Sequence, residues 1–165
     1  MIVVADASPL IILAKIGVLD LLPKLHPRIY ISAEVYSEVV VAGAGLPGAS
    51  QVAEAEWIDV KSLLHGGDLA AAQERFKLGL GELSSILLAK EIGASMVLMD
   101  EERGRQLARD QGLQVRGTVG VLESLYQCGE IPDLRKGFQA LLAQRAHLDL
   151  ELLNRRLHLF RLPPL

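Results

Sequence analysis

Cysteine and aromatic residues are scarce in this sequence of 165 residues. The one cysteine, Cys128, excludes an intramolecular disulfide framework and a cysteine zinc cluster. Aromatic residues make up only 4% of the chain although 50% is apolar, so the core must consist mainly of Leu, Val, Ile and Ala. A chain of this length fits one domain with a sizeable core, and we expect a single domain over residues 1–165.

Long apolar runs and an excess of basic residues are also missing. No run approaches the roughly 18–20 apolar residues that cross a bilayer. The apolar start of the chain carries Asp6 in its middle and no basic segment, unlike a signal peptide, so we expect a cytoplasmic protein outside the membrane. The net charge is −3, whereas proteins that neutralise phosphates are usually basic. A nucleic-acid ligand would therefore require a bound metal or a local basic patch.

Short β-branched runs alternate with longer helical patterns, which is typical of a parallel sheet covered on both faces. The expected strands are residues 2–5, 28–31, 57–60, 95–99 and 114–116. Helices are expected around 68–77, 82–92, 101–111 and 119–127, and after Ser8 and Ser32, with Ser8, Ser32 and Thr118 as their caps. Residues 133–160 form a helical extension in this interpretation. The pattern predicts an α/β fold, a single doubly wound domain with a central parallel sheet and a helical C-terminal tail.

Two carboxylates directly follow predicted strands. Asp6 ends the first strand and Asp100 ends the strand 95–99. Each residue taken alone could simply open a loop or cap a helix. Open parallel sheets bind ligands at the carboxyl ends of their strands, and adjacent strands would bring both carboxylates into one crevice there.

Further acids lie within helical patterns. Glu38 stands between apolar neighbours, on a helix that should pack on the sheet. Glu34 shares its face at the i, i+4 spacing, and we interpret Glu34 as part of a solvated helix face. Glu82 stands at a helix start, where the helix dipole favours an acid by roughly 0.3–1 kcal/mol without any function.

A cluster of such acids would need a cation. Two carboxylates about 4 Å apart repel by roughly 4 kcal/mol at an effective dielectric of about 20. Oxygen ligands without a nearby Cys or His pair suit Mg²⁺ or Mn²⁺ better than zinc. Such ions activate water and stabilise charge on a phosphoryl group. The same crowding predicts that Asp100→Asn keeps or raises the melting temperature without metal.

The order and spacing of four segments resemble PIN-domain nucleases, the fold of the VapC-type toxins. VVADASPLI resembles their opening strand, with Asp6 as the metal-binding acid and Ser8 as the accompanying hydroxyl. ISAEVYSEVV resembles the second motif, with Glu38 as its acid. LGLGELSSILLAKEIGASMVLMDEERGR resembles the third and fourth motifs, which are 18 residues apart from Glu82 to Asp100. GTVGVL, with Thr118, resembles the segment after the last strand, so the resemblance covers about residues 1–128.

Two departures from the best-studied toxins place the chain near a poorly characterised PIN-like branch. The third motif carries Glu82 where those toxins more often have Asp, and Gly104 stands where an aromatic residue is expected. The resemblance implies a metal-dependent endoribonuclease that uses Mg²⁺ or Mn²⁺. Its metal ligands and catalytic residues would be Asp6, Glu38, Glu82 and Asp100, supported by Ser8 and Thr118. Members of the family are often homodimers and often encoded beside a small antitoxin, as the toxins of such pairs.

Several features keep other functions open. Arg103, Arg105 and Arg109 could lead RNA toward the metal, or could form a solvated helix face. The apolar tail 148–165 is expected to pack on the domain or on a partner subunit. One alternative is a catalytically idle PIN-like module that binds RNA or a protein. A further alternative is a phosphoacceptor receiver-type domain, although the first strand offers only Asp6 and the last leads into Gly117 rather than a lysine.

Overall fold

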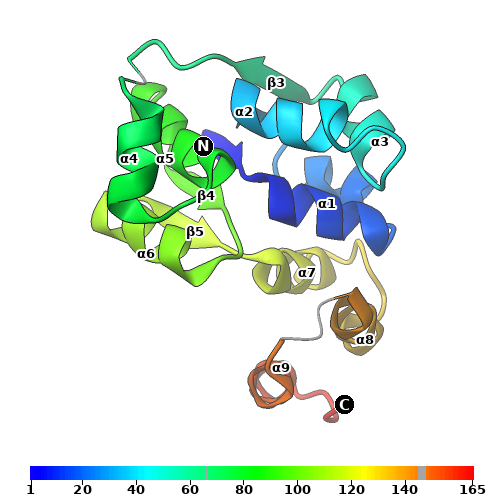
Figure 1. Cartoon of the computed structure of the whole chain (residues 1–165). Helices are drawn as coiled ribbons and strands as arrows, with labels where there is room; N and C mark the ends of the chain where they lie inside the picture. The colour runs from blue at the N-terminus through cyan, green and yellow to red at the C-terminus, as the bar shows by residue number, and fades with distance from the viewer. Residues whose placement is uncertain (66, 145–147) are drawn as a thin grey trace.

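A five-stranded parallel sheet forms the centre of the computed structural model, which describes residues 1–65, 67–144 and 148–165. The strand order is β3-β2-β1-β4-β5 (Figure 1). The strands are β1 (Val3–Ala5), β2 (Ile29–Ser32), β3 (Ile58–Lys61), β4 (Met96–Leu98) and β5 (Gln114–Arg116). Every boundary lies within one residue of the predicted one. The predicted α/β fold with a central parallel sheet is confirmed.

Helices connect and cover the strands. In the first half they are α1 (Ala7–Lys15), the 3-10 helix η1 (Leu19–Lys24), α2 (Ala33–Tyr36), the π-helix η2 (Ser37–Val41) and α3 (Ala49–Glu54). In the second half they are α4 (Leu69–Phe76), α5 (Leu80–Glu91), α6 (Glu102–Asp110), α7 (Thr118–Gln127), α8 (Leu134–Gln144) and α9 (Leu150–Leu159). The predicted helical C-terminus is confirmed where the structure describes it, by α8 and α9, and residues 145–147 of the predicted extension lie outside the described residues. No helix of the described ranges is long and apolar enough to cross a membrane.

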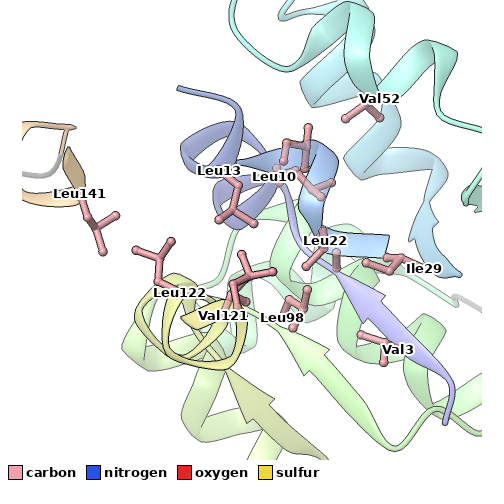
Figure 2. Packing of buried hydrophobic residues seen from close by; sticks show 14 of the residues in the cluster. Val3, Leu10, Leu13, Leu22, Ile29, Val52, Leu98, Val121, Leu122 and Leu141 are labelled. Carbon is pink, nitrogen blue, oxygen red and sulfur yellow. The ribbon is translucent and has the colours of Figure 1, made fainter. Parts of the chain in front are cut away.

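Alternating strand residues build a core on each face of the sheet. Val3 and Leu98 belong to the core beneath α1 and α7, whereas Val4 belongs to the core beneath α5 and α6. Figure 2 shows the first of these cores, where Val121 of α7 lies close to Leu98. Branched aliphatic side chains dominate both cores, as the scarcity of aromatic residues requires.

The C-terminal helices extend the first core away from the sheet (Figure 1). Leu141 of α8 faces α7 in Figure 2, and Leu153 and Leu157 of α9 are fully buried in the same core. The tail therefore packs on its own domain through one face. Its opposite face leaves Leu150 and Leu159 exposed.

The strand order changes direction at β1, which places the crevice of the sheet. The chain passes from β1 to β2 on one side and later returns to β4 on the other side of β1. Ligands of open parallel sheets bind at such a switch point, beyond the carboxyl ends of the strands. The backbone N–H of Asp6 donates to the carbonyl of Leu98 at 2.9 Å, so the two strand ends are joined where the crevice begins.

Candidate functional site

Asp6 lies at the centre of this crevice. It is the N-cap of α1, and its carboxylate accepts a hydrogen bond from the backbone N–H of Ala7 at 2.8 Å. The side chain is only 3% exposed. The cap of α1 is therefore Asp6, and the expectation that Ser8 caps this helix was wrong. Asp6 takes that role because it follows β1 directly, in extended conformation, and this leaves Ser8 in the first turn beside it.

Glu38 and Asp6 both lie next to Gly81, in the first turn of α5. A Cβ atom at Gly81 would lie 2.7 Å from Glu38 Oε2 and 3.1 Å from Asp6 Oδ1. Both carboxylates therefore occupy the space that a side chain at Gly81 would need. Glu82 follows in the first turn of α5 and faces the same hollow, which also receives Ser8.

Two buried serines hold α5 in this position. The hydroxyls of Ser32 and Ser84 are 2.7 Å apart, and Ser32 also caps α2 by accepting from the N–H of Val35 at 3.0 Å. The hydroxyl of Ser84 lies 3.0 Å from the carbonyl of Gly81. The end of β2, the start of α2 and the start of α5 are thus joined. Glu82 lies in the first turn of α5, and Glu38 lies on η2, which directly follows α2. The predicted cap at Ser32 is confirmed.

Burial and neighbouring charge raise the pKa of two of these acids. The pKa of Asp6 rises from 3.8 to about 7, first because the carboxyl is buried and then because Glu82, Glu38 and Asp100 repel its charge, against the lowering effect of the Ala7 N–H. The pKa of Glu82 is also raised, mainly by burial and by the charge of Glu101. The other three predicted acids therefore all act on Asp6 electrostatically. A cation would relieve this repulsion.

Asp100 lies just after β4, and its carboxylate is hydrogen-bonded to the start of α7. Its two carboxylate oxygens accept from the N–H and from the hydroxyl of Thr118, each at 2.7 Å. Thr118 is the first residue of α7 and Gly117 is its cap, so the predicted cap was one residue too late. The structure gives Thr118 a defined role, because it orients the Asp100 carboxylate.

Removing this carboxylate is expected to loosen α7. Asp100→Ala should lower the free energy of unfolding without metal by about 1–3 kcal/mol, because two donors of Thr118 lose a charged acceptor. Asp100→Asn should nearly retain stability, since its amide can accept from the Thr118 N–H and donate to the hydroxyl. Urea unfolding of both variants in EDTA tests this expectation. An alanine variant as stable as the wild type would contradict it.

Glu34 belongs to the site, contrary to the sequence interpretation. Its side chain lines the same hollow as Asp6 and Glu38. Its Oε2 atom is buried and finds no hydrogen-bond partner among the described residues. The prediction of a solvated helix face was wrong because α2 presses this face against the start of α5. The i, i+4 spacing from Glu38 was the available signal.

The three arginines of α6 differ in their surroundings. Arg105 is half-buried and donates to the carbonyl of Met99 at 2.9 Å, next to Asp100. Arg109 pairs with Glu102 at 3.1 Å, and Arg103 is exposed. Only Arg105 among them lines a hollow beside the acids. Gly104 faces Met99 and Glu82: a Cβ there would lie 2.5 Å from the sulfur of Met99, so a larger residue would require Met99 to move.

The hollow around Asp6 has the chemistry of a cation site. Its volume is about 610 Å³, and its acidic lining consists of Asp6, Glu34, Glu38 and Glu82. As arranged, no three Asp, Glu, His or Cys side chains of the described residues are grouped closely enough to hold one ion. The donor set nevertheless fits Mg²⁺ or Mn²⁺, because it offers carboxylate oxygens, and one of them, Glu34 Oε2, is buried with no hydrogen-bond partner in the described part of the chain.

Comparison with protein families agrees with this geometry. A family model described as a PIN domain matches residues 2–161, and thus includes α8 and most of the C-terminal tail. No curated protein matches the sequence. PIN domains are in general nucleases, so the match supports a nuclease-type fold and an activity in the broad class of hydrolases. Since the match covers nearly the whole chain, this protein belongs to a PIN-domain family of poorly characterised function.

Proposed function

We propose that the protein is a metal-dependent endoribonuclease that hydrolyses phosphodiester bonds in single-stranded RNA. One observation carries this proposal: the carboxylates of Asp6 and Glu38 lie together at Gly81. Glu82 lines the same hollow, and Asp100 follows the neighbouring strand. In phosphoryl transfer, the protein mainly positions the reacting groups and neutralises their charge, and it need not form a covalent bond to the substrate. A crevice of carboxylates at the switch point of the sheet suits that task.

The residues take distinct parts in this mechanism. Asp6, Glu38, Glu82 and Glu34 would hold Mg²⁺ or Mn²⁺ from the walls of the hollow. When bound, such an ion lowers the pKa of water and neutralises charge on the phosphoryl group. Asp100, oriented by Thr118, would complete the acidic set from the other side. Ser8, in the first turn of α1, would steady Asp6 or a water molecule.

RNA cleavage with defined product ends tests the reaction. A labelled single-stranded RNA should be cut in Mg²⁺ or Mn²⁺ and should stay intact in EDTA. Attack by water with a 3′ leaving oxygen should yield 5′-phosphate ends, and a 2′-deoxy linkage at the cut should be tolerated. Products with 2′,3′-cyclic phosphates, or cleavage that survives EDTA, would contradict the mechanism. A catalytically idle binding module would bind this RNA and leave it uncut in every metal.

We also propose that the protein forms a homodimer, and that a small antitoxin is a further partner if the chain is the toxin of such a pair. The support is the exposed outer face of α9, where Leu159 is 67% exposed and Leu150 is 48% exposed. Light scattering should give a dimer mass at high concentration, and Leu159→Glu should shift it toward the monomer. A monomer mass at all concentrations would contradict self-association.

A further inference from the structure

A second hollow lies beside the acidic site, on the other side of Asp100. It has a volume of about 630 Å³, within the roughly 300–1,000 Å³ of small-molecule sites. The end of β5, α6, α7 and α9 form its walls. Asp100 lines it at one end, so a ligand in this hollow lies next to the proposed site of cleavage.

The end nearest Asp100 carries two arginines, Arg105 and Arg116, and Arg105 lies next to carboxylates. A Cβ atom at Gly117 would lie 2.7 Å from Nη1 of Arg105 and 2.9 Å from Oδ1 of Asp100, so guanidinium and carboxylate stand side by side. Arg116, at the end of β5, passes over Gly120, where a Cβ would be 2.9 Å from its Cγ. The backbone carbonyl of Arg116 accepts from the N–H of Met99 at 2.9 Å, whereas its guanidinium makes no hydrogen bond or ion pair with the residues that the structure describes. This leaves it available for an anion.

The opposite end is apolar and aromatic. Phe160 lines the hollow and is held edge-on against Tyr126, with 5.8 Å between the ring centres and 75° between the planes. Leu152 of α9 and Val119 of α7 lie beside it. The Arg156 guanidinium forms two hydrogen bonds with Glu123, at 2.5 and 2.6 Å, which fix α9 against α7. This contact between Arg156 and Glu123 therefore holds the α9 end of the hollow, with Phe160, against α7.

We propose that this hollow holds the RNA nucleotide next to the cut phosphodiester, with its phosphate at Arg116 and its base against Phe160. The proposal rests on the proposed ribonuclease function. A cation and an aromatic ring at two ends of one hollow are a combination by which proteins bind unpaired nucleotides, because phosphates attract cations and bases stack on rings.

Binding measured without metal separates this inference from catalysis. Fluorescence anisotropy would follow a labelled single-stranded RNA of about ten nucleotides in EDTA, over a series of salt concentrations. The variants are Arg116→Gln and Phe160→Leu, and the matched control is Arg28→Gln, an exposed arginine at the opposite ends of the strands that pairs with Asp59. Melting curves confirm that each variant is folded.

Each variant has its own expected result. Arg116→Gln should weaken binding roughly tenfold and reduce the slope of log affinity against log salt by about 0.7, the value for one phosphate contact on a single strand. Phe160→Leu should weaken binding several-fold with the slope unchanged. Arg28→Gln should bind as the wild type does. Equal affinity and slope in Arg116→Gln and the control would overturn the proposal. Binding that follows this pattern without any cleavage would retain the nucleotide site and remove only the proposed hydrolysis.

Discussion

Asp6→Asn is expected to reduce RNA cleavage by roughly 10³-fold, the scale on which preorganised electrostatic partners act in catalysis. Asp6 is the most buried of the acids, and its carboxylate lies next to Gly81, as that of Glu38 does. Asparagine can still cap α1, because its carbonyl oxygen can accept from the N–H of Ala7. Titration calorimetry with Mn²⁺ should show a large loss of affinity. Equal affinity, or full activity, in the variant would exclude the site.

The same substitution should raise stability in the absence of metal, and only at higher pH. The pKa of Asp6 is about 7 in the folded protein and close to 3.8 in the unfolded chain. Between these values the folded state binds a proton that the unfolded state lacks, so the wild type loses stability as pH rises from about 4 to 7. Asparagine does not titrate. Asp6→Asn should therefore match the wild type near pH 4 and exceed it near pH 8, by at most about 4 kcal/mol.

Asp59→Asn is the matched control for both measurements. It removes one carboxylate from the far end of the sheet, on β3, where Asp59 pairs with Arg28 at the surface. The variant should cleave RNA as the wild type does and show no gain in stability at pH 8. Urea unfolding in EDTA at both pH values gives the comparison. A stability gain shared by both variants would show that the effect comes from net charge rather than from Asp6.

Gly81→Ala is expected to abolish most of the cleavage without unfolding the protein. The new Cβ would stand 2.7 Å from Glu38 Oε2 and 3.1 Å from Asp6 Oδ1, so both carboxylates must move. Glu38 is a flexible side chain that can turn toward solvent, and alanine favours the helix by about 1 kcal/mol over glycine. We expect an activity loss of roughly 10²-fold, as when a catalytic group is misplaced by about 1 Å, with a melting temperature that is unchanged or higher.

Gly137→Ala provides the control for the effect of helix propensity. Gly137 lies within α8, and a Cβ there would meet Leu122 at 3.6 Å, an ordinary contact. This variant should gain stability and keep full activity. Comparison of cleavage rates and melting temperatures in the two variants separates the helix from the site. A Gly81→Ala variant that is fully active would show that the space between Glu38 and Asp6 is not used.

The sequence by itself determined the sheet, the helices around it and the two acids at its strand ends. These features depend on patterns within a few residues, such as the apolar run that ends at Asp6 and the run that ends just before Asp100. Apolar strands with β-branched residues form wherever both faces are covered. The carboxyl ends of parallel strands then meet at one edge, and the switch point follows from the strand order.

The tertiary structure alone decided how the residues of the site meet, and it added Glu34 to them. The burial of Glu34, the space at Gly81 and the bonds from Thr118 to Asp100 are contacts between elements that lie far apart in the sequence. The i, i+4 spacing of Glu34 from Glu38 and the segment with Thr118 pointed to two of these residues, but the contacts themselves depend on how closely α2 and α5 pack and on where α7 starts. The nucleotide hollow has the same origin. It exists only because α9 folds back onto α7, which brings Phe160 to face the end of β5.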